Sequence, residues 1–173
     1  WLRKQGRAGN TIAIRFRNLR VVFNLAIEME VVKPECYPFK KYKIAKLHQD
    51  TTKRALTKED VQSVINYSTT RRDIYTRLAV NLFTFSYFMG GINFVDMAYL
   101  TRSNIINNRL IYKRKKTSKF INLPLQERAL LIFKEYKDAD NPYLFPILSS
   151  FHKTEQQKLN RLHKVITKVN KAL

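Results

Sequence analysis

The stretch from Asn81 to Leu125, NLFTFSYFMGGINFVDMAYLTRSNIINNRLIYKRKKTSKFINLPL, organises the chain. It opens with an apolar helix that Gly90-Gly91 should end, because glycine frees the backbone and adds little helix stability. Two β-rich runs follow, Arg109 to Lys113 and Phe120 to Leu123, and they predict a hairpin with a lysine cluster at its tip. Such a cluster cannot lie in a core, so we expect its charge to face an acidic partner.

The chain as a whole is strongly basic. Its 173 residues are 45% apolar, which is enough for a core, and carry a formal net charge of +20. This charge predicts an anionic partner, of which duplex DNA is the commonest and a membrane surface is the rival. No apolar run reaches the roughly 18 residues that would span a bilayer. We therefore expect no membrane partner. Cys36 is the single cysteine, which fits a reducing, cytoplasmic location.

The N-terminal part predicts one amphipathic helix. Asn10 is a good N-cap residue, and apolar residues follow it at helical spacing: Ile12, Phe16, Leu19, Phe23 and Ala26. Arg15, Arg17 and Arg20 lie outside this apolar stripe. They form either a solvated basic face or a row of contacts to DNA phosphates.

The segment from Val31 to Asp50 predicts an extended connector. Pro34 and Pro38 favour it, because proline fixes its own φ and disfavours helix before it. Three lysines of this connector are either solvated or placed to contact a DNA backbone: Lys40, Lys41 and Lys43.

Thr57 should open a second domain. Thr57 and Asp60 form a capping-box pattern at the start of a helix. Asp73 should cap a long helix that runs through Met89, with Ile74 as the first residue of its apolar face. This helix is apolar nearly all round, so we expect it to be the buried central helix.

The rest of this domain predicts further helices around the hairpin. Phe94 to Leu100 reads as one or two helical turns in which Asp96 sits among apolar neighbours and needs a partner. Helices should also cover Leu125 to Tyr136 and His152 to Leu173, with Tyr143 to Pro146 returning to the core between them. The predicted fold is therefore mainly α with a small antiparallel β-sheet, an α+β class.

These pieces, in this order, resemble the tyrosine recombinases (phage integrases), in the variant carried by bacterial mobile elements. The matching text is Gly91-Ile92-Asn93-Phe94-Val95-Asp96-Met97, then Lys116-Thr117-Ser118-Lys119 running to Leu123-Pro124-Leu125. Lys53 to Thr57 resembles part of the family's interdomain linker. The resemblance implies two domains: 1–50, the C-terminal part of a helical core-binding (SAM-like) domain with its linker, and 51–173, the N-terminal part of a catalytic domain.

The resemblance also implies an activity, site-specific DNA recombination and integration. Members cut DNA through a 3′-phosphotyrosyl link, with neither metal nor other cofactor, and act as tetramers on double-stranded DNA. By resemblance, Lys116 is the hairpin lysine that can protonate the leaving oxygen, and Lys115 and Lys119 beside it contact DNA. Asp96 would support the site as the acidic residue of its box; a helix-end cap or a surface ion pair are the plainer alternatives.

Two features depart from the family pattern. Asn93 stands where the first catalytic arginine would be, and it carries no charge to grip a phosphate; we expect another cation to supply that charge. None of His48, His152 and His163 is followed three residues later by arginine, and no tyrosine has a matching C-terminal context. We therefore expect an interior fragment that binds DNA but cannot cleave it alone.

Two other functions fit the sequence less closely. A non-catalytic DNA-binding or architectural protein that keeps the recombinase fold would explain Asn93 and the missing His-x-x-Arg motif. A basic RNA-binding or ribosome-associated module would rest on charge alone. Preference for duplex DNA over RNA would separate these two, and a covalent DNA adduct would separate both from the enzyme.

Overall fold

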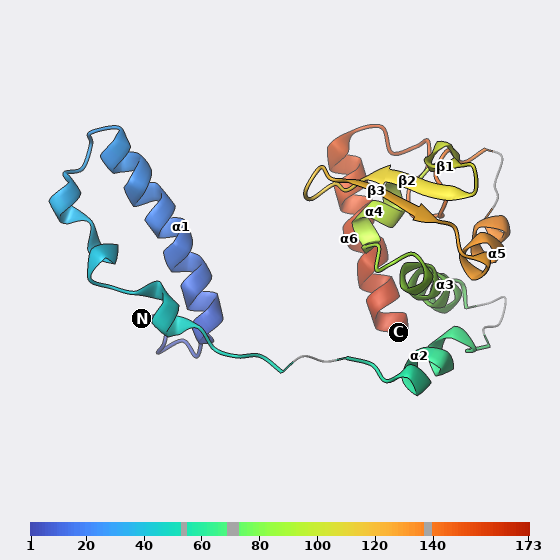
Figure 1. The fold of residues 1–173 in the computed structure, drawn as a ribbon, viewed down its shortest axis with the longest axis horizontal. Helices are drawn as coiled ribbons and strands as arrows, with labels where there is room; N and C mark the ends of the chain where they lie inside the picture. Colours follow the sequence, from blue (N-terminus) through green and yellow to red (C-terminus); the bar gives the residue numbers. More distant parts are fainter. Residues whose placement is uncertain (53–54, 69–72, 137–139) are drawn as a thin grey trace. The chain divides into compact units, whose positions relative to one another are not determined.

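The computed structural model describes residues 1–52, 55–68, 73–136 and 140–173. The chain forms two units, Trp1–Ala55 and Leu56–Leu173, each with its own hydrophobic core (Figure 1). The sequence had placed the boundary after Asp50. Lys53 and Arg54 of the expected linker lie outside the described residues. Within the described residues, no helix is both long enough and apolar enough to cross a membrane.

Unit 1 is built on helix α1 (Gly9–Glu28). The expectation that Asn10 caps this helix is wrong, because Ala8 holds the cap position and Asn10 lies inside the first turn. The Asn10 side chain instead bonds the Gln49 backbone twice, donating to its carbonyl at 2.7 Å and accepting from its N–H at 3.0 Å. Asn10 thus ties the start of α1 to a residue 39 positions away.

The segment after α1 is not an extended connector. It forms three short 3₁₀ turns, η1 (Pro34–Cys36), η2 (Pro38–Lys40) and η3 (Ile44–Leu47), and both prolines sit in first turns, where their fixed φ fits. Apolar side chains of this segment are buried against Ile12 and Ala13 of α1: Phe39, Ile44 and Leu47. Hydrophobic burial therefore overrides the extended preference. Leu19, expected on the packed stripe, is exposed.

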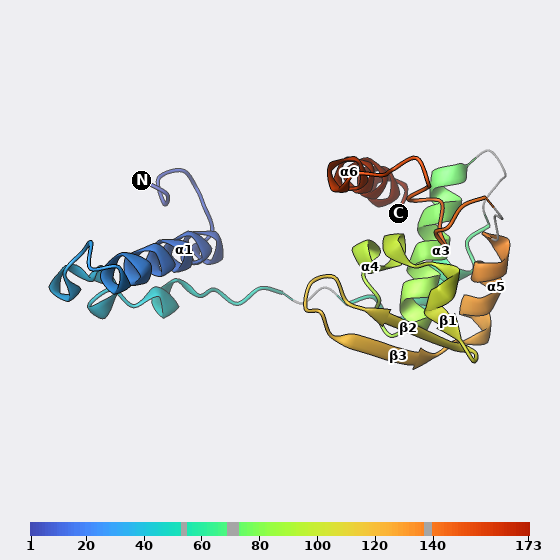
Figure 2. The same ribbon diagram turned by 90° about the horizontal axis from the view of Figure 1, so that it is seen from above.

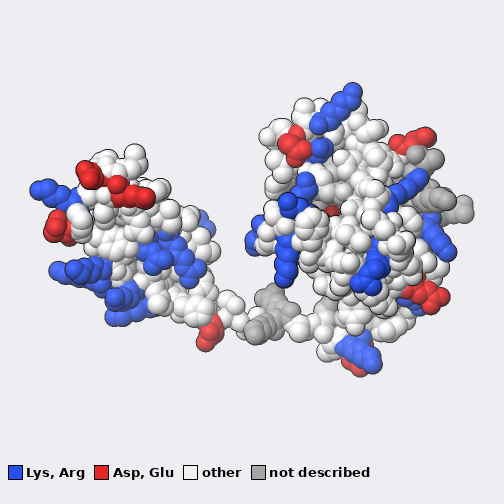
Figure 3. Space-filling model, turned by 45° about the horizontal axis from the view of Figure 1, so that its top comes forward, with Lys and Arg blue, Asp and Glu red and all other residues white. Residues whose placement is uncertain are grey.

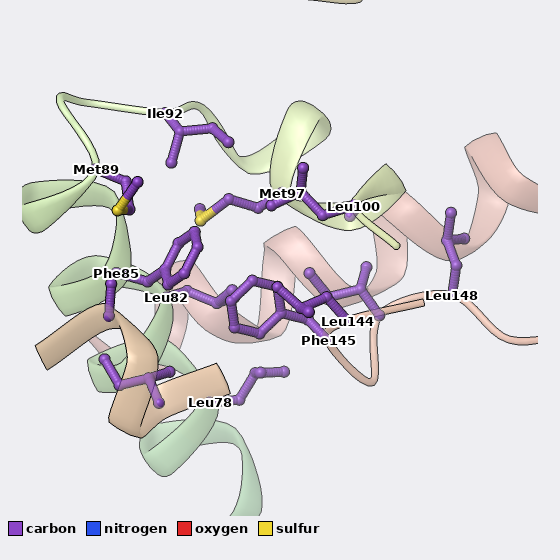
Figure 4. Packing of buried hydrophobic residues seen from close by; sticks show 14 of the residues in the cluster. Leu78, Leu82, Phe85, Met89, Ile92, Met97, Leu100, Leu144, Phe145 and Leu148 are labelled. Carbon is purple, nitrogen blue, oxygen red and sulfur yellow. The ribbon is translucent and has the colours of Figure 1, made fainter. Parts of the chain in front are cut away.

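Unit 2 surrounds helix α3 (Ile74–Phe88), as the sequence predicted. Helices α2 (Lys58–Ile65), α5 (Glu127–Glu135) and α6 (Glu155–Ala172) pack against it. Figure 2 shows α6 and the sheet near opposite ends of α3. Phe85 is fully buried and meets the Phe145 ring edge-on at 5.0 Å (Figure 4). Ile74, at the helix end, is 69% exposed, contrary to expectation.

The sheet has three antiparallel strands in the order β1-β2-β3: Ile105–Ile106, Arg109–Lys113 and Phe120–Pro124. The predicted hairpin is confirmed, with Leu110 opposite Leu123 in its register. Strand β1 was not predicted. Asn107 and Asn108 connect it to β2 with φ values of 48° and 57°, the left-handed pair that a two-residue hairpin turn requires.

The remaining elements of unit 2 connect α3 to the sheet and return the chain to the core. Gly90 and Gly91 both have positive φ and end α3 as expected; α4 (Phe94–Tyr99) and η4 (Arg102–Asn104) then lead to β1. Leu144 and Phe145 return to the core, as predicted. Ile132 of α5 is buried while Leu131 is exposed, and Leu159 of α6 is exposed. Helix α6 was expected to start at His152 but starts at Glu155, behind a Thr154 capping box.

Candidate functional site

Asp96 is the centre of the candidate site. It lies in the first turn of α4, and its side chain is buried, with the residue 3% exposed. One carboxylate oxygen accepts the backbone N–H of Lys115 at 2.8 Å, and the other accepts the Asn93 amide at 2.6 Å. A buried carboxylate is tolerated when it is bonded in this way. Asp96 is therefore a buried, hydrogen-bonded carboxylate in the first turn of α4, and the half-exposed Arg114 is its ion-pair partner.

Asn93 is the N-cap of α4. Its side-chain oxygen accepts the Asp96 backbone N–H at 2.9 Å, while its amide donates to the Asp96 carboxylate. Both polar atoms of the side chain are therefore used inside the protein. Asn93 lies in the candidate site, as expected, but its amide is directed at Asp96.

The turn between β2 and β3 carries the lysine cluster. Two backbone bonds close it, from Arg114 N–H to the Lys119 carbonyl at 2.9 Å and from Ser118 N–H to the Arg114 carbonyl at 2.8 Å. Ser118 takes a left-handed φ of 55° to complete the turn. Because Asp96 also holds the Lys115 N–H, the turn is fixed to the start of α4. The sequence placed these segments near each other only by family resemblance.

The predicted lysines occupy distinct positions on this turn. Lys115 places its ammonium 3.9 Å from the centroid of the Tyr99 ring, a cation–π contact. Lys116 and Lys119 are exposed, and within the described chain no group bonds or pairs with the Lys116 side chain. The Lys116 ammonium is therefore accessible to a ligand on a turn whose backbone is held.

Arg114 belongs to this site and was not singled out from the sequence. Its Nε lies 3.8 Å from the second carboxylate oxygen of Asp96, and its side chain is 41% exposed. Leu110 and Tyr112 of β2 are buried. Side chains alternate along a strand, so Arg114 continues the side of the hairpin that carries Leu110 and Tyr112. That alternation was the signal that could have identified it.

A small hollow of about 180 Å³ lies beside Asp96 and Lys115, and Tyr99 and Tyr112 line part of it. Burial, and then the nearby Glu155 carboxylate, raises the pKa of Tyr99 above its usual value. Burial, and then Asp96, raises the pKa of Tyr112. Both phenols therefore stay protonated at neutral pH and can act as hydrogen-bond donors. The Tyr99 hydroxyl already donates to the Glu155 carboxylate at 3.4 Å, and the Asp96 carboxylate lines the hollow, so Lys113 and Lys115 supply the positive charge of its lining.

The other candidate DNA-binding residues lie on unit 1. Arg15, Arg17 and Arg20 are exposed on α1, and three lysines are exposed on the segment after it: Lys40, Lys41 and Lys43. Among the described residues, no carboxylate lies within 4 Å of any of these six cations. Lysine and arginine side chains are visible over the surface of each unit (Figure 3).

Comparison with known proteins bears on unit 1. Residues 1–44 match the family model of the phage integrase SAM-like domain. These residues hold α1 and the first two 3₁₀ turns. The match supports the tyrosine recombinase (phage integrase) family. A search of curated proteins found no match.

Proposed function

We propose that this chain is the DNA-binding and partial catalytic region of a tyrosine-type site-specific recombinase. The observation that carries the proposal is the bond between buried Asp96 and the backbone of Lys115, which fixes the lysine-bearing turn to α4. The SAM-like match over residues 1–44 supports it independently, because it lies in the other unit. The proposed substrate is double-stranded DNA, and the proposed assembly is a tetramer on that DNA.

The proposed reaction needs charge stabilisation and a proton. A tyrosine hydroxyl attacks a phosphodiester and gives up its proton to solvent, a bond forms between its oxygen and phosphorus, and the bond to the 5′-oxygen breaks. That oxygen then takes a proton. Lys116 is the proposed proton donor, because its ammonium is exposed on a held turn. General acid catalysis by a positioned group contributes about 10²- to 10⁴-fold in rate. The attacking tyrosine is not assigned to any residue of this chain.

Arg114 is the proposed source of the charge that Asn93 lacks. Asn93 is neutral, and its amide is engaged with Asp96. The Arg114 guanidinium is half-exposed and stands beside the Asp96 carboxylate, which can orient it. Arginine stays charged and can donate two parallel bonds to a phosphate. Asp96 is then a positioning residue for both Arg114 and the turn, and its own carboxylate does not contact DNA.

The test compares cleavage with binding in the full-length gene product. Lys116→Ala should lower cleavage of a duplex substrate by about 10²- to 10⁴-fold, while the Kd for the same duplex changes only a few-fold. Lys134→Ala is the matched control, because Lys134 is exposed on α5 and outside the site. Unchanged cleavage in Lys116→Ala would overturn the assignment of this residue.

A non-catalytic DNA-binding protein is the second candidate. The neutral Asn93, committed to the α4 cap, favours it. This alternative expects no covalent protein–DNA adduct from the full-length gene product, even on a suicide substrate that traps the 3′-linked intermediate. An adduct would exclude it.

A further inference from the structure

A second group of cations lies on α6, apart from the hairpin turn. Arg161, Lys164 and Lys168 follow one another at spacings of three and four residues, so they share a face of the helix. With Tyr75 of α3, they line an open hollow of about 430 Å³. None of these four residues was a candidate from the sequence.

Two of these cations are held in place by the protein. The Lys168 ammonium donates to the Tyr75 hydroxyl at 3.1 Å and lies 4.4 Å from the centre of its ring. Arg161 donates from Nε to the Ile147 carbonyl at 3.0 Å. The hydrogen bond from Lys168 lowers the pKa of Tyr75 most, burial opposes it with the next largest effect, and the charges of Lys168 and Arg161 lower this pKa further. A solvated charged face would leave these side chains free, whereas here they converge on one phenol.

The charge in this hollow is not neutralised. Elsewhere on unit 2, Arg77 pairs with Glu135 at 2.6 Å and Lys158 pairs with Glu155 at 2.7 Å. In the part of the chain that the structure describes, no carboxylate comes within 4 Å of Arg161, Lys164 or Lys168. Like charges on one helix face disfavour the helix. A bound anion would remove this repulsion.

The cations that line this hollow form a row with those of the candidate site. The Tyr99 ring has the Lys115 ammonium of the hairpin turn at 3.9 Å and the Lys158 ammonium of α6 at 6.0 Å. Lys158 and Arg161 are three residues apart, so they share a face of α6. From Lys158 to Lys168 the helix rises about 15 Å. That length corresponds to about four base-pair steps of a duplex.

We propose that the hollow formed by Tyr75, Arg161, Lys164 and Lys168 binds backbone phosphates of duplex DNA a few steps away from the proposed cleavage site. Held arginine and lysine donors and a phenol hydroxyl are the groups that contact phosphates without reading sequence. The inference rests on the proposed function for its ligand. It adds a contact that positions the duplex along α6, separate from the hairpin turn that would act on the scissile phosphate.

The test measures duplex affinity of the 173-residue chain as a function of salt, by fluorescence anisotropy. The variant is Lys164→Gln/Lys168→Gln, which leaves the Arg161 bond to the Ile147 carbonyl intact. The control is Lys58→Gln/Lys134→Gln, which removes the same charge from exposed positions on α2 and α5. Vesicles of phosphatidylcholine and phosphatidylserine serve as a second anionic ligand.

Each phosphate contact contributes about 0.9 to the slope of log K against log salt, so the variant should lose about 2 from this slope. The ratio of wild-type to variant affinity should therefore be about tenfold larger at 50 mM than at 200 mM salt. The control should keep the wild-type slope. Equal slopes in all three proteins would overturn the inference alone, and so would equal losses in variant and control. The inference would also be overturned if the wild-type chain bound the vesicles more tightly than the duplex and the two substitutions weakened that vesicle binding. Absence of duplex binding by the wild-type chain would reject the proposed function as well.

Discussion

Replacing Asp96 by asparagine should separate α4 from the hairpin turn. The carboxylate accepts two bonds, one at each oxygen, from the Lys115 N–H at 2.8 Å and from the Asn93 amide at 2.6 Å. An asparagine side chain keeps one acceptor oxygen and replaces the other by a donating NH₂ group. In either orientation, one of the two donors then faces another donor inside the protein.

The expected loss of stability follows from the buried position of Asp96. A hydrogen bond to a charged group contributes about 1.5–3 kcal/mol, and a buried donor without a partner costs about 1–3 kcal/mol. We therefore expect Asp96→Asn to lower the free energy of unfolding of unit 2 by about 3 kcal/mol. That is a large part of the roughly 5–15 kcal/mol of a typical domain.

An exchange of the two side chains provides the matched control. In the double variant Asn93→Asp/Asp96→Asn, the carboxylate introduced at position 93 remains a good N-cap. It can accept a bond from the amide introduced at position 96, and the oxygen of that amide can accept the Lys115 N–H. This double variant should regain most of the loss and differ from wild type by about 1 kcal/mol. Asn93→Asp alone places two carboxylates together, so it should destabilise at neutral pH and less in acid.

Urea unfolding followed by circular dichroism measures the stability of each variant, and amide hydrogen exchange measures the Lys115 N–H directly. Asp96→Asn should speed exchange at Lys115, and the double variant should slow it again. The reasoning is refuted if Asp96→Asn stays within about 0.5 kcal/mol of wild type, the range of ordinary surface substitutions, and keeps the Lys115 amide protected.

Two further predictions concern the framework around the site. Phe85→Ala should cost about 3–5 kcal/mol in urea unfolding, because Phe85 is fully buried against Phe145; Tyr87→Ala, at a position 53% exposed on the same helix, should cost far less. Hydrogen bonds from the Thr57 backbone N–H, and then from its side chain, hold the pKa of Asp60 below its usual value. The stabilisation from this ionised carboxylate is thus present at neutral pH and is lost as the pH falls through the lowered pKa. Thr57→Val should shrink that acid-side loss, which pH-dependent unfolding curves measure; an unchanged curve would contradict the capping interpretation.

Predictions that depended on near neighbours in the chain were mostly confirmed. The hairpin, the capping box at Thr57 and the glycine stop after α3 all follow from residues within a few positions of one another. The central α3 helix was also predicted, because its apolar residues cover nearly its whole circumference. An error arose where the periodic pattern extended the packed stripe of α1 to Leu19, which is exposed.

Segments without strong local preference were settled by contacts across the chain. Asparagine favours helix caps, yet the Asn10 side chain forms hydrogen bonds with the backbone of Gln49, which is distant in sequence. The segment after α1 had prolines that favour extension, yet Phe39 and Leu47 gain more by burial against α1. Such outcomes depend on which surfaces pack together, and a local sequence pattern does not predict those long-range contacts.

The sequence by itself determined the basic charge, the helical framework and the lysine-bearing hairpin, because composition, periodicity and turn residues act locally. Only the tertiary structure decided that Asp96 faces the hairpin turn, that Asn93 is bound to Asp96, and that Arg114 stands beside them. It also brought Tyr75 of α3 to Lys168 of α6, 93 residues away in the chain. Each of these contacts joins elements that approach one another only when the apolar faces around α3 are buried together.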